Sequence, residues 1–107
     1  MIEIFYANRF KKDVKKLLKK NKRLRQDIDD LIQELLLNPS FGTSLGNNCY
    51  KIRLKDSSST KGKRGGYRVI TYLLEKNKKI ILLTIYSKSA KSTVTDEEIK
   101  GILQELQ

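Results

Sequence analysis

The chain has 107 residues, and its 23 lysines and arginines outnumber its 12 acidic residues to give a formal net charge of +11. This length predicts a single domain over residues 1–107, and the charge favours a nucleic acid or an acidic protein as partner over a merely solvated basic surface. The sequence has no histidine and one cysteine, which excludes a Ser-His-Asp triad, a histidine metal site, a zinc knuckle and an internal disulfide.

The sequence predicts neither a membrane span nor an export signal. No apolar run approaches the roughly 20 residues that a transmembrane helix needs. The first six residues, MIEIFY, lack the basic start of a secretory signal. A single cysteine suits a reducing compartment. We therefore expect a cytoplasmic protein with no membrane partner.

The first part of the chain predicts a strand and two helices. Apolar and polar residues alternate over residues 2–6, which is typical of a short strand. Asn8 is a candidate N-cap for the helix that follows, and residues 10–18 carry an apolar stripe at helical spacing. Residues 24–35 carry a second stripe, with Asp27 and its acidic neighbours expected on the polar side. Two amphipathic helices in a row predict a helical hairpin packed on an apolar surface.

The second part predicts a meander of strands and a last helix. The composition of residues 38–48 indicates a loop. Three strands are expected, at residues 50–55, 67–74 and 80–86, and the last of them is apolar enough to be buried on both faces. Thr95 and Glu98 form a capping box before the final helix. The expected order is β-α-α-β-β-β-α, an α+β fold in which a mainly antiparallel sheet packs against the helical hairpin.

The cations form two groups. Residues 9–25 hold ten cations with Asp13 as the only acid, and residues 51–68 hold seven cations with Asp56 as the only acid. The first group predicts a solvated helix face that adds long-range attraction. The second group lies on two predicted strands and the loop between them, and it indicates a more specific site.

The loop before the second predicted meander strand is rich in glycine and cations. Gly62, Gly65 and Gly66 leave the backbone free to bring cations close to a ligand, which is expected of Lys61, Lys63 and Arg64. The spacing does not match a phosphate-binding P-loop. A flexible linker is the alternative interpretation of this loop.

Arg68 and Tyr86 are expected to be neighbours. In a meander the start of one strand lies beside the end of its antiparallel partner, so Arg68 should be close to Tyr86 with Lys88 in reach. An arginine on a central strand is costly without an anionic partner or ligand. Cations suit phosphate and a ring suits base stacking, although core packing is the alternative for Tyr86.

Four blocks of the sequence together resemble a known family. They are CYKIRL at residues 49–54, KGKRGGYRVI at 61–70, LTIYSKS at 83–89 and TDEE at 95–98. In this order they resemble the RelE superfamily of toxins from bacterial type II toxin–antitoxin modules, and most closely its HigB-type branch. The resemblance covers nearly the whole chain. It implies an endoribonuclease that enters the ribosomal A site and cuts mRNA there, and it implies a cognate antitoxin, often a helix-turn-helix protein.

The resemblance also implies roles for residues. The basic active-site residues of the family fall on Lys51, Arg53, Arg68 and Lys88. RelE has a functional tyrosine just before its last helix, and the corresponding position here is Thr95. Tyr86, at the end of the neighbouring strand, is expected to substitute for it.

The chemistry expected of such a site needs no metal and no cofactor. The 2′-hydroxyl of RNA attacks the adjacent phosphate, and the protein stabilises charge and moves protons. The candidate catalytic residues are Lys51, Arg53, Arg64, Arg68, Tyr86 and Lys88. The candidate substrate-binding residues are Lys55, Lys61, Lys63 and Lys91. The alternatives are a ParE-like inhibitor of DNA gyrase and an RNA-binding module without catalysis.

Overall fold

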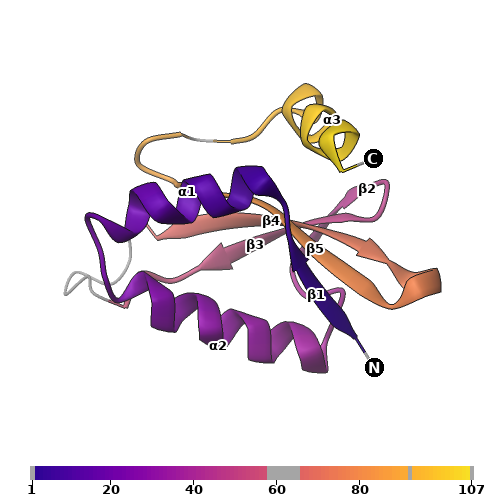
Figure 1. Ribbon diagram of the computed structural model, residues 1–107, viewed down its shortest axis with the longest axis horizontal. Coiled ribbons are helices and arrows are strands. Elements are labelled where there is room, and N and C mark those ends of the chain that lie inside the picture. Colours follow the sequence, from indigo (N-terminus) through magenta and orange to yellow (C-terminus); the bar gives the residue numbers. More distant parts are fainter. Residues whose placement is uncertain (1, 58–65, 92, 107) are drawn as a thin grey trace.

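The computed structural model describes residues 2–57, 66–91 and 93–106, and it has an α+β architecture (Figure 1). The elements are β1 (Glu3–Tyr6), α1 (Asn8–Leu18), α2 (Leu24–Leu37), β2 (Thr43–Gly46), β3 (Cys49–Leu54), β4 (Tyr67–Leu74), the short 3₁₀ helix η1 (Glu75–Asn77), β5 (Lys79–Ser87) and α3 (Asp96–Glu105). The expected order is confirmed, with β2 as an addition. Lys61, Lys63 and Arg64 lie outside the described residues.

The described residues form one mixed sheet with the strand order β1-β5-β4-β3-β2. β3, β4 and β5 make the expected antiparallel meander, and β1 pairs in parallel with β5. β5 therefore has neighbours on both sides and is buried along most of its length, as its apolar run predicts.

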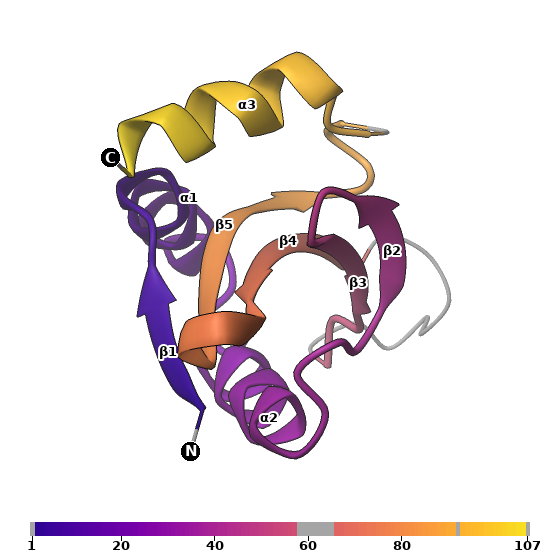
Figure 2. The ribbon, with the colours of Figure 1, turned by 90° about the vertical axis from the view of Figure 1, so that its right-hand side faces the viewer.

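Helices cover both faces of the sheet (Figure 2). α1 and α2 pack on one face, where Phe10 and Leu24 join the core formed by the strands. α3 packs on the opposite face through Ile99 and Ile102, which belong to the same buried cluster as Ile70 of β4. Each large apolar side chain that is fully buried contributes about 1.5–3 kcal/mol relative to exposure, so the two clusters hold the sheet from both sides. No helix in the described ranges is both long and apolar enough to span a membrane.

β2 forms where the composition predicted a loop. Asn47 and Asn48 both have positive φ values, 52° and 65°, which is the backbone that a tight hairpin turn requires. The turn brings Ser44 opposite Tyr50 of β3. All four residues of β2 are exposed, so this edge strand has no apolar alternation by which the sequence could have revealed it.

Two local predictions are wrong. The N-cap of α1 is Ala7 and not Asn8, because the amide of Ala7 still donates to the carbonyl of Leu82, 2.9 Å away, and keeps this residue extended. Asp27 is buried and not on the polar side of α2; its Oδ2 accepts a hydrogen bond from the amide of Ser57 at 3.2 Å. The capping box of Thr95 and Glu98 is confirmed.

Candidate active site

Three neighbouring strands bring one row of side chains together on the face of the sheet that carries α3. Arg53 of β3 pairs with Arg68 of β4, and Arg68 pairs with Tyr86 of β5. Side chains of directly paired residues share a face, with Cβ atoms about 4.5–5.5 Å apart. The expected proximity of Arg68 and Tyr86 is thus confirmed. We call Arg53, Arg68 and Tyr86 the cross-strand row.

The two arginines of the cross-strand row lack a carboxylate partner among the described residues. The ion pairs there are Arg9–Asp13 and Lys91–Glu98. Arg53 is exposed and Arg68 is half-buried. Nη1 of Arg68 donates to the carbonyl of Tyr67 at 3.3 Å. Like charges directly opposite each other on a sheet are destabilising, so this pair is suited to hold an anion.

Three predicted lysines of the site lie near the cross-strand row and differ in their exposure to solvent. Lys51 is half-buried on β3, on the same face as Arg53, and pairs with Ile70. Lys88 is exposed, and its amide donates to the carbonyl of Gly66 at 3.2 Å, which places it beside the start of β4. Lys55 is exposed just beyond the end of β3. The roles of these lysines remain predictions.

Tyr86 is the buried member of the cross-strand row. The residue is 8% exposed and packs in the same cluster as Val94 and Ile99. Its Oη is buried and has no hydrogen-bond partner among the described residues. This burial favours core packing over base stacking for the Tyr86 ring.

Lys91, predicted to bind substrate, is already engaged by a carboxylate. Its Nζ donates to Oε2 of Glu98 and lies 5.9 Å from the centre of the Tyr86 ring. The hydrogen bond from Lys91, followed by that from the amide of Thr95, lowers the pKa of Glu98. The sequence revealed Glu98 only as a helix cap, because Lys91 lies seven positions earlier in a loop and local patterns do not show how that loop folds back.

Sequence reasoning also missed the role of Asp13 in fixing β5. Its Oδ2 accepts hydrogen bonds from Oγ1 of Thr84 at 2.5 Å and from the amide of Ile85 at 3.3 Å. The strand register shifts at this point, where Ile70 faces Thr84 but Thr71 faces Leu82. The carboxylate thus binds β5 at a β-bulge, and Thr84 lies two residues before Tyr86. The one available signal was that Asp13 is the only acid among ten cations.

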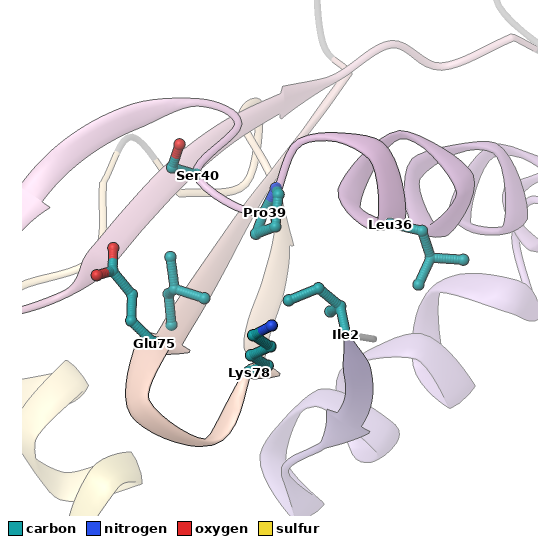
Figure 3. A pocket seen from close by; sticks show the side chains of 7 residues that line it. Ile2, Leu36, Pro39, Ser40, Glu75 and Lys78 are labelled. Carbon is teal, nitrogen blue, oxygen red and sulfur yellow. The ribbon is translucent and has the colours of Figure 1, made fainter.

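Two apolar hollows lie away from the cross-strand row. One is a groove of about 380 Å³ between α1 and α2; Phe10, Val14 and Ile28 are part of its floor, and Lys11, Lys15 and Arg25 line it as well. The other, of about 720 Å³, is formed by Ile2, Leu36, Pro39, Ser40, Leu73, Glu75 and Lys78 (Figure 3). Within the part of the chain that the structure describes, no cluster of cysteine and acidic side chains is able to hold a metal ion.

Comparison with known proteins identifies the family. A family model described as the RelE toxin of the RelE/RelB toxin–antitoxin system matches residues 2–106. A solved structure of free Escherichia coli RelE with two arginine-to-alanine substitutions is 16% identical, with 99% of this chain and 98% of that chain covered and a TM-score of 0.63. A chain of the intact E. coli RelBE toxin–antitoxin complex is 19% identical, with coverages of 79% and 94% and a TM-score of 0.58. These structural similarities show a shared fold, and the family model shows that the protein belongs to the RelE family of toxins.

Proposed function

We propose that the protein is the toxin of a type II toxin–antitoxin module and that it cleaves mRNA on the ribosome without a metal ion. Membership of the RelE family supports the toxin role. The observation that carries the nuclease role is the opposed pair Arg53 and Arg68, which has no carboxylate partner in the described part of the chain. A phosphodiester between two guanidinium groups relieves their repulsion and accepts hydrogen bonds from both.

The proposed reaction is an internal transesterification of RNA. The 2′-oxygen forms a bond to the adjacent phosphorus, and the bond from phosphorus to the 5′-oxygen breaks, which leaves a 2′,3′-cyclic phosphate and a 5′-hydroxyl. One group removes the proton of the 2′-hydroxyl and another supplies a proton to the departing oxygen. Fixed cations stabilise the additional negative charge that the phosphorane carries in between.

The positions of the residues favour a different role in the reaction for each. Arg68 and Arg53 are suited to charge stabilisation, because a guanidinium can bind two phosphate oxygens at once. Lys51 and Lys88 are accessible candidates for proton transfer. Tyr86 is covered, so we assign it to the support of Arg68. Arg64, Lys61 and Lys63 remain predicted phosphate contacts, and Lys55 an outer one.

Dependence on the ribosome follows from the kinds of group at this site. The chain has no histidine, and lysine and arginine are weak acid–base catalysts near neutral pH because their pKa values are ordinarily well above 7. Such a site gains most from a substrate that is already held in the geometry for in-line attack. A ribosome that holds mRNA in the A site provides this orientation. The proposal places the toxin in the cytoplasm, where translation occurs.

Primer extension on an mRNA with and without translating ribosomes tests the function. We expect discrete cuts by the wild-type protein only when ribosomes are present, and a loss of cleavage of at least about 100-fold in Arg68→Ala. Arg23→Ala removes an exposed arginine at the start of α2 and should cut like the wild type. Efficient cleavage of free RNA would contradict ribosome dependence. The absence of cuts in every sample would contradict the nuclease, and a DNA supercoiling assay would then test gyrase inhibition.

We also propose that the cognate antitoxin binds the groove between α1 and α2. The groove has an apolar floor, where the rings of Tyr6 and Phe10 stack 5.7 Å apart, and Lys11, Lys15 and Arg25 add positive charge. An acidic amphipathic segment matches both features. The family resemblance predicts that the rest of the antitoxin is a helix-turn-helix protein that is encoded beside the toxin.

Charge reversal on α1 tests this interface. The double variant Lys11→Glu/Lys15→Glu should weaken antitoxin binding by about tenfold or more, because like charges would then face the acidic segment. The control Lys12→Glu/Lys16→Glu makes the same change of charge on exposed residues of α1 that do not line the groove. Titration of each toxin variant with the purified antitoxin measures the affinity. Equal weakening by both double variants would show only a general charge effect and contradict the proposed groove.

A further inference from the structure

The two carboxylate oxygens of Glu98 have different partners. Oε1 accepts hydrogen bonds from the amide of Thr95 at 3.1 Å and from its hydroxyl at 3.3 Å, which closes the capping box of α3. Oε2 accepts from Nζ of Lys91. One side chain therefore begins the last helix and holds a lysine that belongs to the preceding loop.

The held lysine lies next to the cross-strand row. Lys91 lies in a turn after β5, where its amide donates to the carbonyl of Ser87 at 3.0 Å. Its ammonium group is 5.9 Å from the centre of the Tyr86 ring, and Tyr86 is paired with Arg68. A lysine side chain without such a partner is free to adopt many rotamers. Glu98 removes that freedom at the place where the row meets α3.

We propose that Glu98 is a positioning residue for the cleavage reaction, because it holds the ammonium group of Lys91 beside the cross-strand row. The inference rests on the proposed nuclease function. A cation held in place before the substrate arrives stabilises developing negative charge without reorganisation at the moment of reaction. The rival role for Glu98 is to neutralise Lys91, so that RNA is held less tightly. The two roles predict different kinetics, since positioning acts on kcat and neutralisation acts on KM.

Glu98→Gln separates the two oxygens of the side chain. The amide oxygen of glutamine can still accept from Thr95 and keep the capping box, whereas its NH₂ group cannot accept from Lys91. Glu97→Gln is the matched control, because Glu97 is an exposed residue in the same first turn of α3. We expect kcat for cleavage on ribosomes to fall about tenfold in Glu98→Gln with KM unchanged, and we expect no change in Glu97→Gln. Equal kcat values in the two variants, or a lower KM with kcat unchanged, would overturn the proposal.

A double-mutant cycle shows whether Glu98 acts through Lys91. Lys91→Met should lose activity, and the addition of Glu98→Gln should reduce it no further, because the interaction is already gone. Lys91→Arg, which keeps a cation and a donor, should retain most of the activity. Additive losses in the double variant would show that Glu98 acts independently of Lys91 and would overturn the inference.

NMR of the lysine ammonium groups distinguishes this inference from the function on which it rests. The protons of an ammonium group that is held by a carboxylate exchange slowly with water. Lys91 should therefore give an ammonium signal in the wild type and in Glu97→Gln, and this signal should be lost in Glu98→Gln. Unchanged signals in all three proteins would overturn the inference even if RNA is cleaved. A wild-type protein that does not cleave mRNA on ribosomes would instead refute the proposed function and the catalytic part of the inference, and the signal would still decide whether Glu98 holds Lys91.

Discussion

At the scale of single residues, partly buried polar contacts connect the helices to the strands that carry the cross-strand row. Nδ2 of Asn21, just after α1, donates to Oδ1 of Asp56 and to Oη of Tyr67, each at 3.0 Å. Asp13 on α1 binds the bulge in β5. Both contacts lie close in sequence to residues of the row. The row thus depends on polar side chains that were not themselves candidates for function.

Asp13→Ala should destabilise the protein by about 1–3 kcal/mol, because it leaves the hydroxyl of Thr84 and the amide of Ile85 buried without this partner. Both residues are 2% exposed, so loss of the carboxylate leaves two polar groups that are poorly hydrated. Urea denaturation measures the loss. Arg9→Ala removes only the exposed partner of Asp13 and should change stability by less than about 1 kcal/mol. Equal effects of the two substitutions would contradict the structural role of Asp13.

At the scale of elements, two glycines differ in the space that is available for an added Cβ atom. Gly66, just before β4, has φ +44°, and a Cβ added there would lie 2.9 Å from the carbonyl oxygen of Leu54. This close approach joins the end of β3 to the start of β4, two residues from Arg68. Gly101 lies inside α3 and has nothing within 4 Å of an added Cβ.

The two glycines should therefore respond to alanine with opposite sign. Gly66→Ala should destabilise the protein by about 1–3 kcal/mol through backbone strain and the clash with β3. Gly101→Ala should stabilise it by about 0.5–1 kcal/mol, because alanine loses less entropy in a helix. Thermal and urea unfolding of both variants provide the comparison. A stabilising Gly66→Ala would show that the backbone near the row is not held in the left-handed region.

At the scale of the whole molecule, the net charge of +11 should govern how the protein finds RNA. The lysines of α1 are exposed, and the one acid of that helix is turned toward β5. The outer surface of α1 is therefore cationic. It adds attraction at a distance from the cross-strand row, which fits a partner as large as a ribosome better than a small ligand.

Binding to single-stranded RNA should weaken steeply with salt. The logarithm of the affinity should fall linearly with the logarithm of the salt concentration, with a slope of about −0.7 for each phosphate that is contacted. Fluorescence anisotropy at several salt concentrations gives the slope. Lys12→Glu/Lys16→Glu should give a shallower slope than the wild type. Affinity that does not change with salt would contradict an electrostatic mode of RNA binding.

The sequence by itself determined most of the elements and one pairing of the site. Apolar periodicity is local, so it located the helices and the meander. The spacing of Thr95 and Glu98 is local as well, and it located the capping box of α3. The meander in turn predicted that Arg68 lies beside Tyr86, because adjacent antiparallel strands joined by a short turn have few possible registers.

Only the tertiary structure decided which polar groups meet. The contact of Lys91 with Glu98 and that of Asp13 with β5 depend on how loops and helices fold back over the sheet. β2 exists because a turn brings exposed residues to the edge of β3, and the buried Asp27 accepts a hydrogen bond from the amide of Ser57, 30 residues away. None of these features has a sequence period. Each depends on long-range packing, which short-range patterns do not encode.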